Sequence, residues 1–373
     1  MTNKKFKLAA MSLATAVAVS TVGPSASAVT YYLGDGSVTV DKDDTRGAYS
    51  YQGEDGSEKH RTYVNEDEAD KGTIYVQDGH KPTGEVTPPT DNSDNGTAET
   101  TPTDNATQST DASGNNAENS PTAETTTPNT ITVKEDVTGA TIEVNGVNVD
   151  TSTQTDPSKD KTIIKVGEGA DVDLTVKDSN LTTGGHGIDI GVNLEGKDEN
   201  KGANVDLTLD NTQINLTQNG KAGINVQDNS DVALTLKGDD NLIDGSKAIK
   251  NEKENILKNN VNVEGIRVGD GGASDGSGTS AGANTKLTIS GGVEKTETAE
   301  TDTEETESPA GGSLTISDTT GGLAMADGSH VKITDGADVT IEDTKTSGAT
   351  QAGRAVTQHG DLTISGGSSL TID

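Results

Sequence analysis

The sequence predicts an all-β protein, a right-handed, single-stranded parallel β-helix in which short strands stack into one solenoid. Three observations predict it. Short segments of the form apolar-Thr-apolar recur along the chain, and Gly, Asn and Asp separate them. No Phe, Trp or Tyr occurs between residues 76 and 373. A segment of this length without aromatic side chains must bury many small aliphatic residues, and stacked repeats do so efficiently.

The repeated segments contain a threonine that alternates with Val, Leu and Ile, which is typical of a strand with one buried face. The aligned positions are Thr175, Thr208, Thr235, Thr288, Thr315, Thr340, Thr363 and Thr371. Most intervals between them are 23 to 33 residues, and such a period indicates a solenoid. We interpret the interval of 53 before Thr288 as about two coils, with a strand in VNVEGIRV at 261–268 filling the gap.

Aliphatic side chains of successive coils should form columns, because neighbouring strands lie about 4.8 Å apart. We expect Val172 to lie above Val205, and Val205 above Val232. Turns rich in Asn and Asp follow the strands, since these residues tolerate left-handed conformations. From those turns, Asn180 and Asn241 are expected to join an internal ladder of amide hydrogen bonds.

One pair of segments occurs twice. The chain ends with LTISGGSSLTID at 362–373, and LTISGG at 287–292 is separated from GGSLTIS at 311–317 by a strongly acidic segment. We interpret both pairs as two consecutive strands of one coil joined at a glycine corner. Residues 293–310 are then an insertion at a turn facing water, where insertions are tolerated.

Shorter strands are expected between the threonine segments, and one short helix is expected in KAIKNEKENILK at 247–258. The further expected strands are GSVTVD at 36–41, RTYV at 61–64, GTIYVQDG at 72–79, GIDIGVNL at 187–194, INLT at 214–217 and GINVQ at 223–227. Two or three strands per coil, separated by turn residues, favour a β-helix over folds that alternate strands with helices.

The first residues have the pattern of a secretory signal peptide. Positive residues precede an apolar and small-residue stretch from Leu8 to Val22, and Ala26-Ser27-Ala28 offers a cleavage site. Residues 1–28 are therefore predicted to be removed, so the mature protein is expected to be secreted. No other segment approaches the length of a membrane span.

Four zones are expected in all. After residues 1–28, residues 29–80 contain all six tyrosines and are interpreted as capping first coils. Residues 81–130 are rich in Pro, Thr, Asn and Asp and predict a disordered linker or loop. Residues 131–373 form the β-helix, with a second disordered loop at 293–310.

Composition excludes several partners. The net charge of −33 opposes binding to nucleic acid and to anionic lipid surfaces, whereas it is compatible with cations as binding partners. The chain contains no cysteine, so stability must come from packing and repetition rather than from disulfides.

Candidate binding residues are few. The sequence singles out Tyr49, Tyr51, Tyr63 and Tyr75 as possible ligand-binding side chains, because their aromatic rings can contact glycans. No cofactor is expected. Calcium is kept as an alternative, although GDGGASDGSG at 269–278 occurs once and a flexible loop is the preferred interpretation.

A polysaccharide lyase is the third alternative, after a binding scaffold and a calcium-assisted carbohydrate-binding module. Such an enzyme needs a basic residue near the substrate proton and carboxylates for calcium. Beyond the tyrosine-rich segment the chain has two arginines and three histidines, and none lies in a recognisable cluster in the sequence: Arg267, Arg354, His186, His330 and His359. We therefore expect a protein that is not an enzyme.

Several segments resemble a known family. They are YYLGDGSVTVD, GTIYVQDG, NTITVKEDVTGATIEVNGVNVD, GKAGINVQDNSDVALTLKGDDNLIDG and LTISGG. The chain resembles secreted β-helix surface proteins of Gram-positive, often gut-dwelling bacteria, labelled adhesin-like or carbohydrate-binding. The resemblance implies a surface scaffold whose partners are extracellular polysaccharides or host glycans and proteins. It carries over no catalytic residue, and attachment to the cell is expected through a region beyond Asp373.

Overall fold

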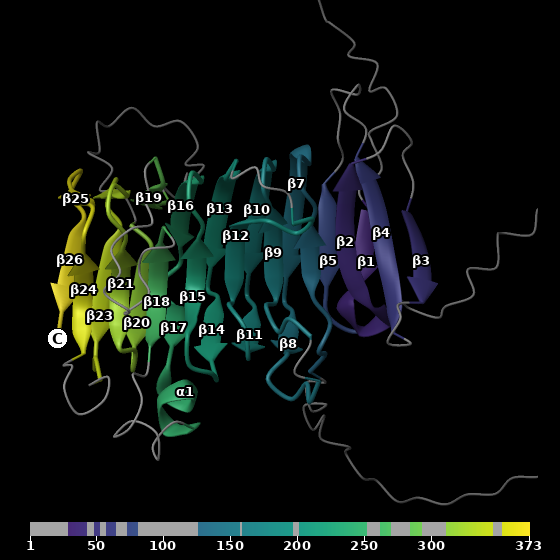
Figure 1. Cartoon of the computed structure of the whole chain (residues 1–373), viewed down its shortest axis with the longest axis horizontal. Helices are drawn as coiled ribbons and strands as arrows, with labels where there is room; N and C mark the ends of the chain where they lie inside the picture. Colours follow the sequence, from purple (N-terminus) through teal and green to yellow (C-terminus); the bar gives the residue numbers. More distant parts are fainter. Residues whose placement is uncertain are drawn as a thin grey trace, which may run out of the picture.

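In the computed structural model the chain is a parallel β-helix, with strands stacked coil upon coil along one axis (Figure 1). The structure describes residues 29–42, 48–52, 57–64, 73–80, 126–156, 159–196, 201–251, 262–269, 284–292, 311–345 and 353–373. The predicted signal peptide at 1–28, most of the predicted linker at 81–130 and the acidic segment at 293–310 lie outside these residues.

The strands belong to three sheets, here named A, B and C. Sheet A consists, in order, of β1 (Val29–Tyr32), β5 (Ile74–Gln77), β7 (Thr138–Asn145), β10 (Asp171–Lys177), β13 (Asn204–Asp210), β16 (Asp231–Lys237), β19 (Lys286–Gly291), β22 (His330–Thr334) and β25 (Asp361–Ile364). Sheet B consists of β24 (Arg354–Gln358), β21 (Gly321–Met325), β18 (Val263–Val268), β15 (Lys221–Val226), β12 (Ile188–Val192), β9 (Ile164–Gly167), β6 (Ile131–Val133), β2 (Ser37–Lys42), β4 (Glu58–Val64) and β3 (Ala48–Gln52). Sheet C consists of β26 (Ser369–Ile372), β23 (Asp338–Glu342), β20 (Ser313–Ser317), β17 (Asn241–Asp244), β14 (Gln213–Leu216), β11 (Asn180–Thr183) and β8 (Asn148–Asp150).

From β7 onward each complete coil contributes one strand to sheet A, then one to sheet C, then one to sheet B. The short helix α1 (Ser246–Asn251) follows β17 at one corner and overlaps the first residues of the segment where the sequence predicts a helix, 247–258. At the N-terminal end β3 pairs antiparallel with β4, whereas the other described strand pairs are parallel. An antiparallel strand at this position covers the edge of sheet B, which would otherwise expose unpaired backbone groups.

Stacked aliphatic columns fill the interior, as the alternation predicts. Val172 pairs with Val205, which pairs with Val232, and each is at most 3% exposed. The same register places leucines at the next inward position of these three strands. From β7 onward the coils repeat this pattern, so small aliphatic side chains build a continuous core there without an aromatic residue. On β1, Tyr31 contributes an aromatic ring to the core.

The glycine corners are also as predicted. β19 and β20 are consecutive strands of one coil, as are β25 and β26, and in each pair the first belongs to sheet A and the second to sheet C. Thr288 and Thr315 therefore lie on different sheets of the same coil. Their separation of 27 positions is not a coil repeat.

The interpretation of the interval of 53 as two coils is wrong. β16 pairs directly with β19, so a single coil spans that interval, and the expected strand at 261–268 is the sheet B strand β18 of that coil. The aliphatic residues set the register, which places Thr235 opposite Ser290 and Thr288 opposite Ala233. Connections of unequal length between strands enlarge the interval without adding a coil.

The predicted amide ladder is wrong as well, although the predicted turn conformation is present. Asn180 is exposed and its side-chain oxygen accepts a hydrogen bond from Asn215 at 2.8 Å. Asn241 is buried, and its oxygen accepts from the Thr212 N–H at 3.0 Å while its nitrogen donates to backbone carbonyls. The two asparagines thus point to opposite sides of the coil. The turn residue Asp178 has a φ of 46°.

A glycine column sets how closely sheets B and C approach each other. Gly187, Gly223, Gly265 and Gly322 occupy the same position at the start of successive sheet B strands. A Cβ at Gly223 would lie 2.5 Å from Cγ2 of Ile243, and a Cβ at Gly322 would overlap Cγ2 of Ile341 in the same way. Both isoleucines belong to the following coil and to sheet C. Only glycine leaves room for them.

Replacing Gly322 with alanine tests this close approach. Gly322→Ala should lower the free energy of unfolding by about 1–3 kcal/mol, because the added methyl group has no room. Its neighbour Gly321 is the matched control, since a Cβ there meets its nearest atom, Cγ of Glu264, at 3.5 Å. Gly321→Ala should change stability by less than about 0.5 kcal/mol in chemical denaturation. Equal effects of the two changes would contradict this account.

Candidate functional site

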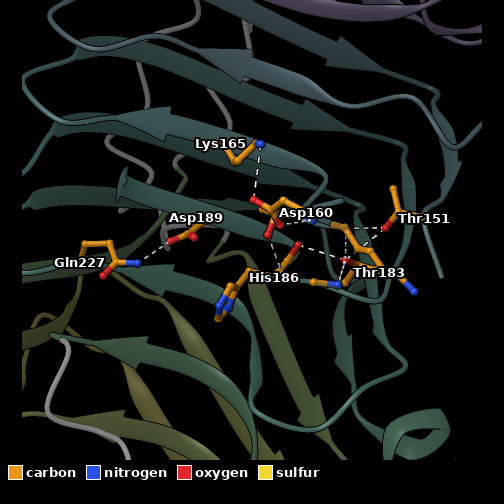
Figure 2. A network of polar contacts seen from close by, with 10 residues as sticks. Thr151, Asp160, Lys165, Thr183, His186, Asp189 and Gln227 are labelled. Atoms are coloured by element: carbon orange, nitrogen blue, oxygen red, sulfur yellow. Dashed lines mark hydrogen bonds and ion pairs between the residues drawn. The ribbon is translucent and has the colours of Figure 1, made fainter. Parts of the chain in front are cut away.

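The outer face of sheet B carries a polar column that does not belong to the core. Lys165, Asp189, Asn225 and Arg267 follow one another on β9, β12, β15 and β18. His186 lies just before β12, on the same face, as Figure 2 shows together with Asp189. Parallel register brings these residues together, although they are far apart in the sequence.

Asp189 is held by two amide side chains. It is 7% exposed, and its Oδ1 accepts hydrogen bonds from Nδ2 of Asn225 at 2.8 Å and from Nε2 of Gln227 at 3.0 Å. Burial raises the pKa of the Asp189 carboxyl, and these two hydrogen bonds only partly oppose the increase. Its other oxygen, Oδ2, accepts no hydrogen bond within the described ranges.

His186 is fixed as a neutral imidazole. It is 8% exposed, and its Nδ1 accepts a hydrogen bond from the Ala222 N–H at 3.1 Å. The proton of the neutral ring is therefore on Nε2. Burial, together with the nearby charges of Arg267 and Lys221, lowers the pKa of His186 to about 3. At neutral pH His186 can donate a hydrogen bond but carries no charge.

Two ion pairs flank these residues. Lys165 Nζ lies 3.4 Å from Oδ2 of Asp160, and Arg267 pairs with the buried Glu264. Burial opposes ionisation of Asp160, but the Thr162 N–H and Lys165 outweigh it and lower the pKa of Asp160. Lys165 and Arg267 are thus each paired with a carboxylate of their own. The cluster can orient a polar group by hydrogen bonding.

The sequence interpretation missed this cluster, because it found His186 and Arg267 without neighbours. A signal was present in three segments of the form Gly-Ile-x-Ile/Val, at 187–190, 223–226 and 265–268. Aligning them would have placed Asp189, Asn225 and Arg267 in one column. The relation is hard to see in the sequence, because successive segments are separated by unequal distances of 36 and 42 residues.

The outer face of sheet A carries a different feature, a hollow of about 520 Å³ over β19, β22 and β25. Lys286, His330 and Asp361 form one row across these strands, and a second row runs parallel to it. The second row is Thr288, Lys332 and Thr363. We call these six residues together with Gln358 the sheet A hollow. Its surface combines cationic and hydroxyl groups in a protein whose net charge is −33.

A column of hydroxyl groups leads along sheet A to this hollow. Thr175, Thr208, Thr235 and Ser290 are directly opposite one another on four consecutive strands, and each is half-buried. Oγ1 of Thr235 and Oγ of Ser290 are 3.5 Å apart. We call these four residues the hydroxyl column.

The four tyrosines chosen from the sequence do not share one sheet. Tyr49 lies on β3, Tyr51 on β3 and Tyr63 on β4, all in sheet B, whereas Tyr75 lies on β5 in sheet A. The side chains of the first three lie outside what the structure describes. Tyr75 is half-buried opposite Glu143. Ligand binding by these tyrosines stays a prediction.

Comparisons with known proteins identify no relative, because no family model, curated protein or solved structure matches the chain. Within the described ranges no three His, Cys, Asp or Glu residues are grouped so as to hold a metal ion. The helices of those ranges include none with the length and apolar character that a membrane crossing requires.

The neutral state of His186 predicts part of the acid sensitivity of the fold. The unfolded residue binds a proton near pH 6.5, the folded one only near pH 3, so the unfolded state binds more protons in between. Stability should therefore fall as the pH falls through this interval, by about 1.4 kcal/mol per pH unit from this residue. His186→Gln, which keeps an acceptor for Ala222, should show a shallower fall in the thermal midpoint. The same change at the exposed His359 is the control, and identical curves for the two variants would contradict the assignment.

The raised pKa of Asp189 makes stability depend on pH in the opposite direction to His186. Its contribution to stability is present below the ordinary value of 3.8 and is lost as the pH rises through the folded-state pKa. Asp189→Asn retains the oxygen that accepts both amide hydrogen bonds and removes the buried charge. The variant should melt at a higher temperature than the wild type at neutral pH, and the difference should disappear in acid. A variant that melts lower at neutral pH would show that the charge itself is stabilised.

Proposed function

We propose that the protein is a secreted or cell-surface interaction scaffold of the adhesin-like kind, without catalytic activity, that binds polysaccharide through the outer face of sheet A. The partner class is extracellular polysaccharide or a surface glycan. The resemblance to secreted β-helix surface proteins supports the proposal, and so does the arrangement of polar groups on this face.

The hydroxyl column is the observation that carries the proposal. Strand propensity alone would accept Val or Tyr at these positions as readily as Thr. The adjacent outward column of the same strands does vary, from Asp173 and Asp206 to Ala233 and Thr288. Hydroxyl groups that repeat at the strand spacing of about 4.8 Å match the advance of one sugar ring along an extended polysaccharide. Each coil therefore offers one donor and acceptor per ring.

Calcium-assisted carbohydrate binding is the second candidate, and one observation favours it. Asp173 and Asp206 are exposed and directly opposite on adjacent strands, where like charges destabilise the pair. A bound cation would relieve this repulsion and could coordinate sugar hydroxyls. If EDTA changes neither carbohydrate binding nor thermal stability, this candidate is excluded.

A polysaccharide lyase receives little support from the groups on sheet B. Arg267 is paired with Glu264, and Nδ1 of His186 already accepts a hydrogen bond. Neither residue is arranged as a base that could remove a substrate proton. Incubation with polygalacturonate is the direct check, and the appearance of unsaturated products would overturn the non-enzymatic assignment.

The hydroxyl column can be tested by removing its hydroxyl groups alone. The double change Thr208→Val and Thr235→Val keeps the shape and strand propensity of both residues and should weaken binding to immobilised polysaccharides about tenfold. The matched control is Thr315→Val with Thr340→Val, because these threonines are also half-buried and opposite each other, but on sheet C. Polygalacturonate, xylan and mannan surfaces provide the measurement. Equal binding by both double variants would reject sheet A as the binding face.

A further inference from the structure

Charge changes sign along the outer face of sheet A. On β10, β13 and β16 its first outward row carries Asp171, Asn204 and Asp231. The next row adds an aspartate on β10 and another on β13. On β19 and β22 the same row continues as Lys286 and His330. A ligand lying along this face therefore meets an acidic region first and a basic region at the sheet A hollow.

The basic side chains of the sheet A hollow are only partly paired with carboxylates. Nζ of Lys286 lies 3.2 Å from Oδ2 of Asp231, and Nδ1 of His330 lies 3.1 Å from Oδ2 of Asp361. Lys332 is exposed and has no ion-pair partner in the part of the chain that the structure describes. Thr288 and Thr363 flank it on the neighbouring strands. One lysine is thus fully available to a ligand, and a second is shared with a carboxylate at the rim.

The positions of the two lysines suit a repeating anion better than a single one. Lys286 and Lys332 lie on adjacent strands and in adjacent rows, so their backbones are roughly 8 Å apart. Long flexible side chains from these points can reach acidic groups on successive or alternate sugars of a chain that crosses the strands. Ser290 of the hydroxyl column lies on the same strand as Lys286 and would contact the ring hydroxyls.

We propose that the sheet A hollow binds polysaccharides that carry carboxylate or sulfate groups, with Lys286 and Lys332 contacting the anions and threonines contacting the ring hydroxyls. This inference rests on the proposed function, to which it adds the class of ligand. Among anionic polymers a polysaccharide fits best, because double-stranded nucleic acid carries a far denser negative charge. The acidic region that adjoins the hollow would repel the duplex more strongly than a polysaccharide.

The test compares acidic and neutral forms of one polymer. The wild-type protein should bind immobilised polygalacturonate at least about tenfold more tightly than fully methyl-esterified polygalacturonate, and added salt should weaken this binding. Lys286→Ala with Lys332→Ala should lower the affinity for the acidic form about tenfold and leave the ester unaffected. Lys237→Ala is the matched control, because Lys237 is exposed at the end of β16 on the same face.

A gain of affinity provides a second readout. Asp361→Asn removes the carboxylate that lines the hollow and should strengthen binding of polygalacturonate, which mere loss of structure would not do. Equal affinity for the acid and its ester, or no effect of the two lysine changes, overturns this inference. If neutral xylan still binds and its binding still depends on Thr208 and Thr235, the proposed function stands without the inference about acidic polysaccharides. Tighter binding of duplex DNA than of polygalacturonate overturns the assignment to a polysaccharide.

Discussion

The parallel pairing of each coil with the next is the constraint on which the other features depend. Inward aliphatic residues such as Leu174, Leu207 and Leu234 can form a column only when successive strands keep one register. That register also fixes every outward position. The hydroxyl column, the lysines of the sheet A hollow and the buried Asp189 therefore follow from packing inside the solenoid. The pairing of successive strands places residues side by side that are far apart in the sequence.

The local features of the fold could be predicted from the sequence, whereas the register could not be predicted throughout. Alternating Val, Leu and Ile identify the strands, and the paired LTIS segments identify the corner between sheets A and C. The threonines misled the alignment across the coil that contains Thr235, because threonine occupies different outward positions on β16 and β19. Only the inward residues carry register, and the unequal connections between strands conceal it.

The polar clusters were harder to predict for the same reason. Asp189 and Arg267 become neighbours of Asn225 only after the coils are aligned, and no local motif marks them. The tyrosines were chosen as ligand-binding candidates from composition. Composition shows where aromatic residues occur along the chain but not which sheet each one belongs to. On sheet A the informative feature is a change from Asp231 to Lys286 at one position of the repeat. Such a change becomes visible only when the strands are read as a column.

The glycine column has a consequence for how the molecule can vary in length. Each glycine of the column receives an isoleucine from the coil that follows it, so the fit joins neighbours in the stack. Gly223 with Ile243 and Gly265 with Ile316 are the same joint made twice. Duplication or deletion of a whole coil would leave an intact joint at the new boundary. Recombination in units of one coil could therefore lengthen or shorten the outer faces while conserving their spacing.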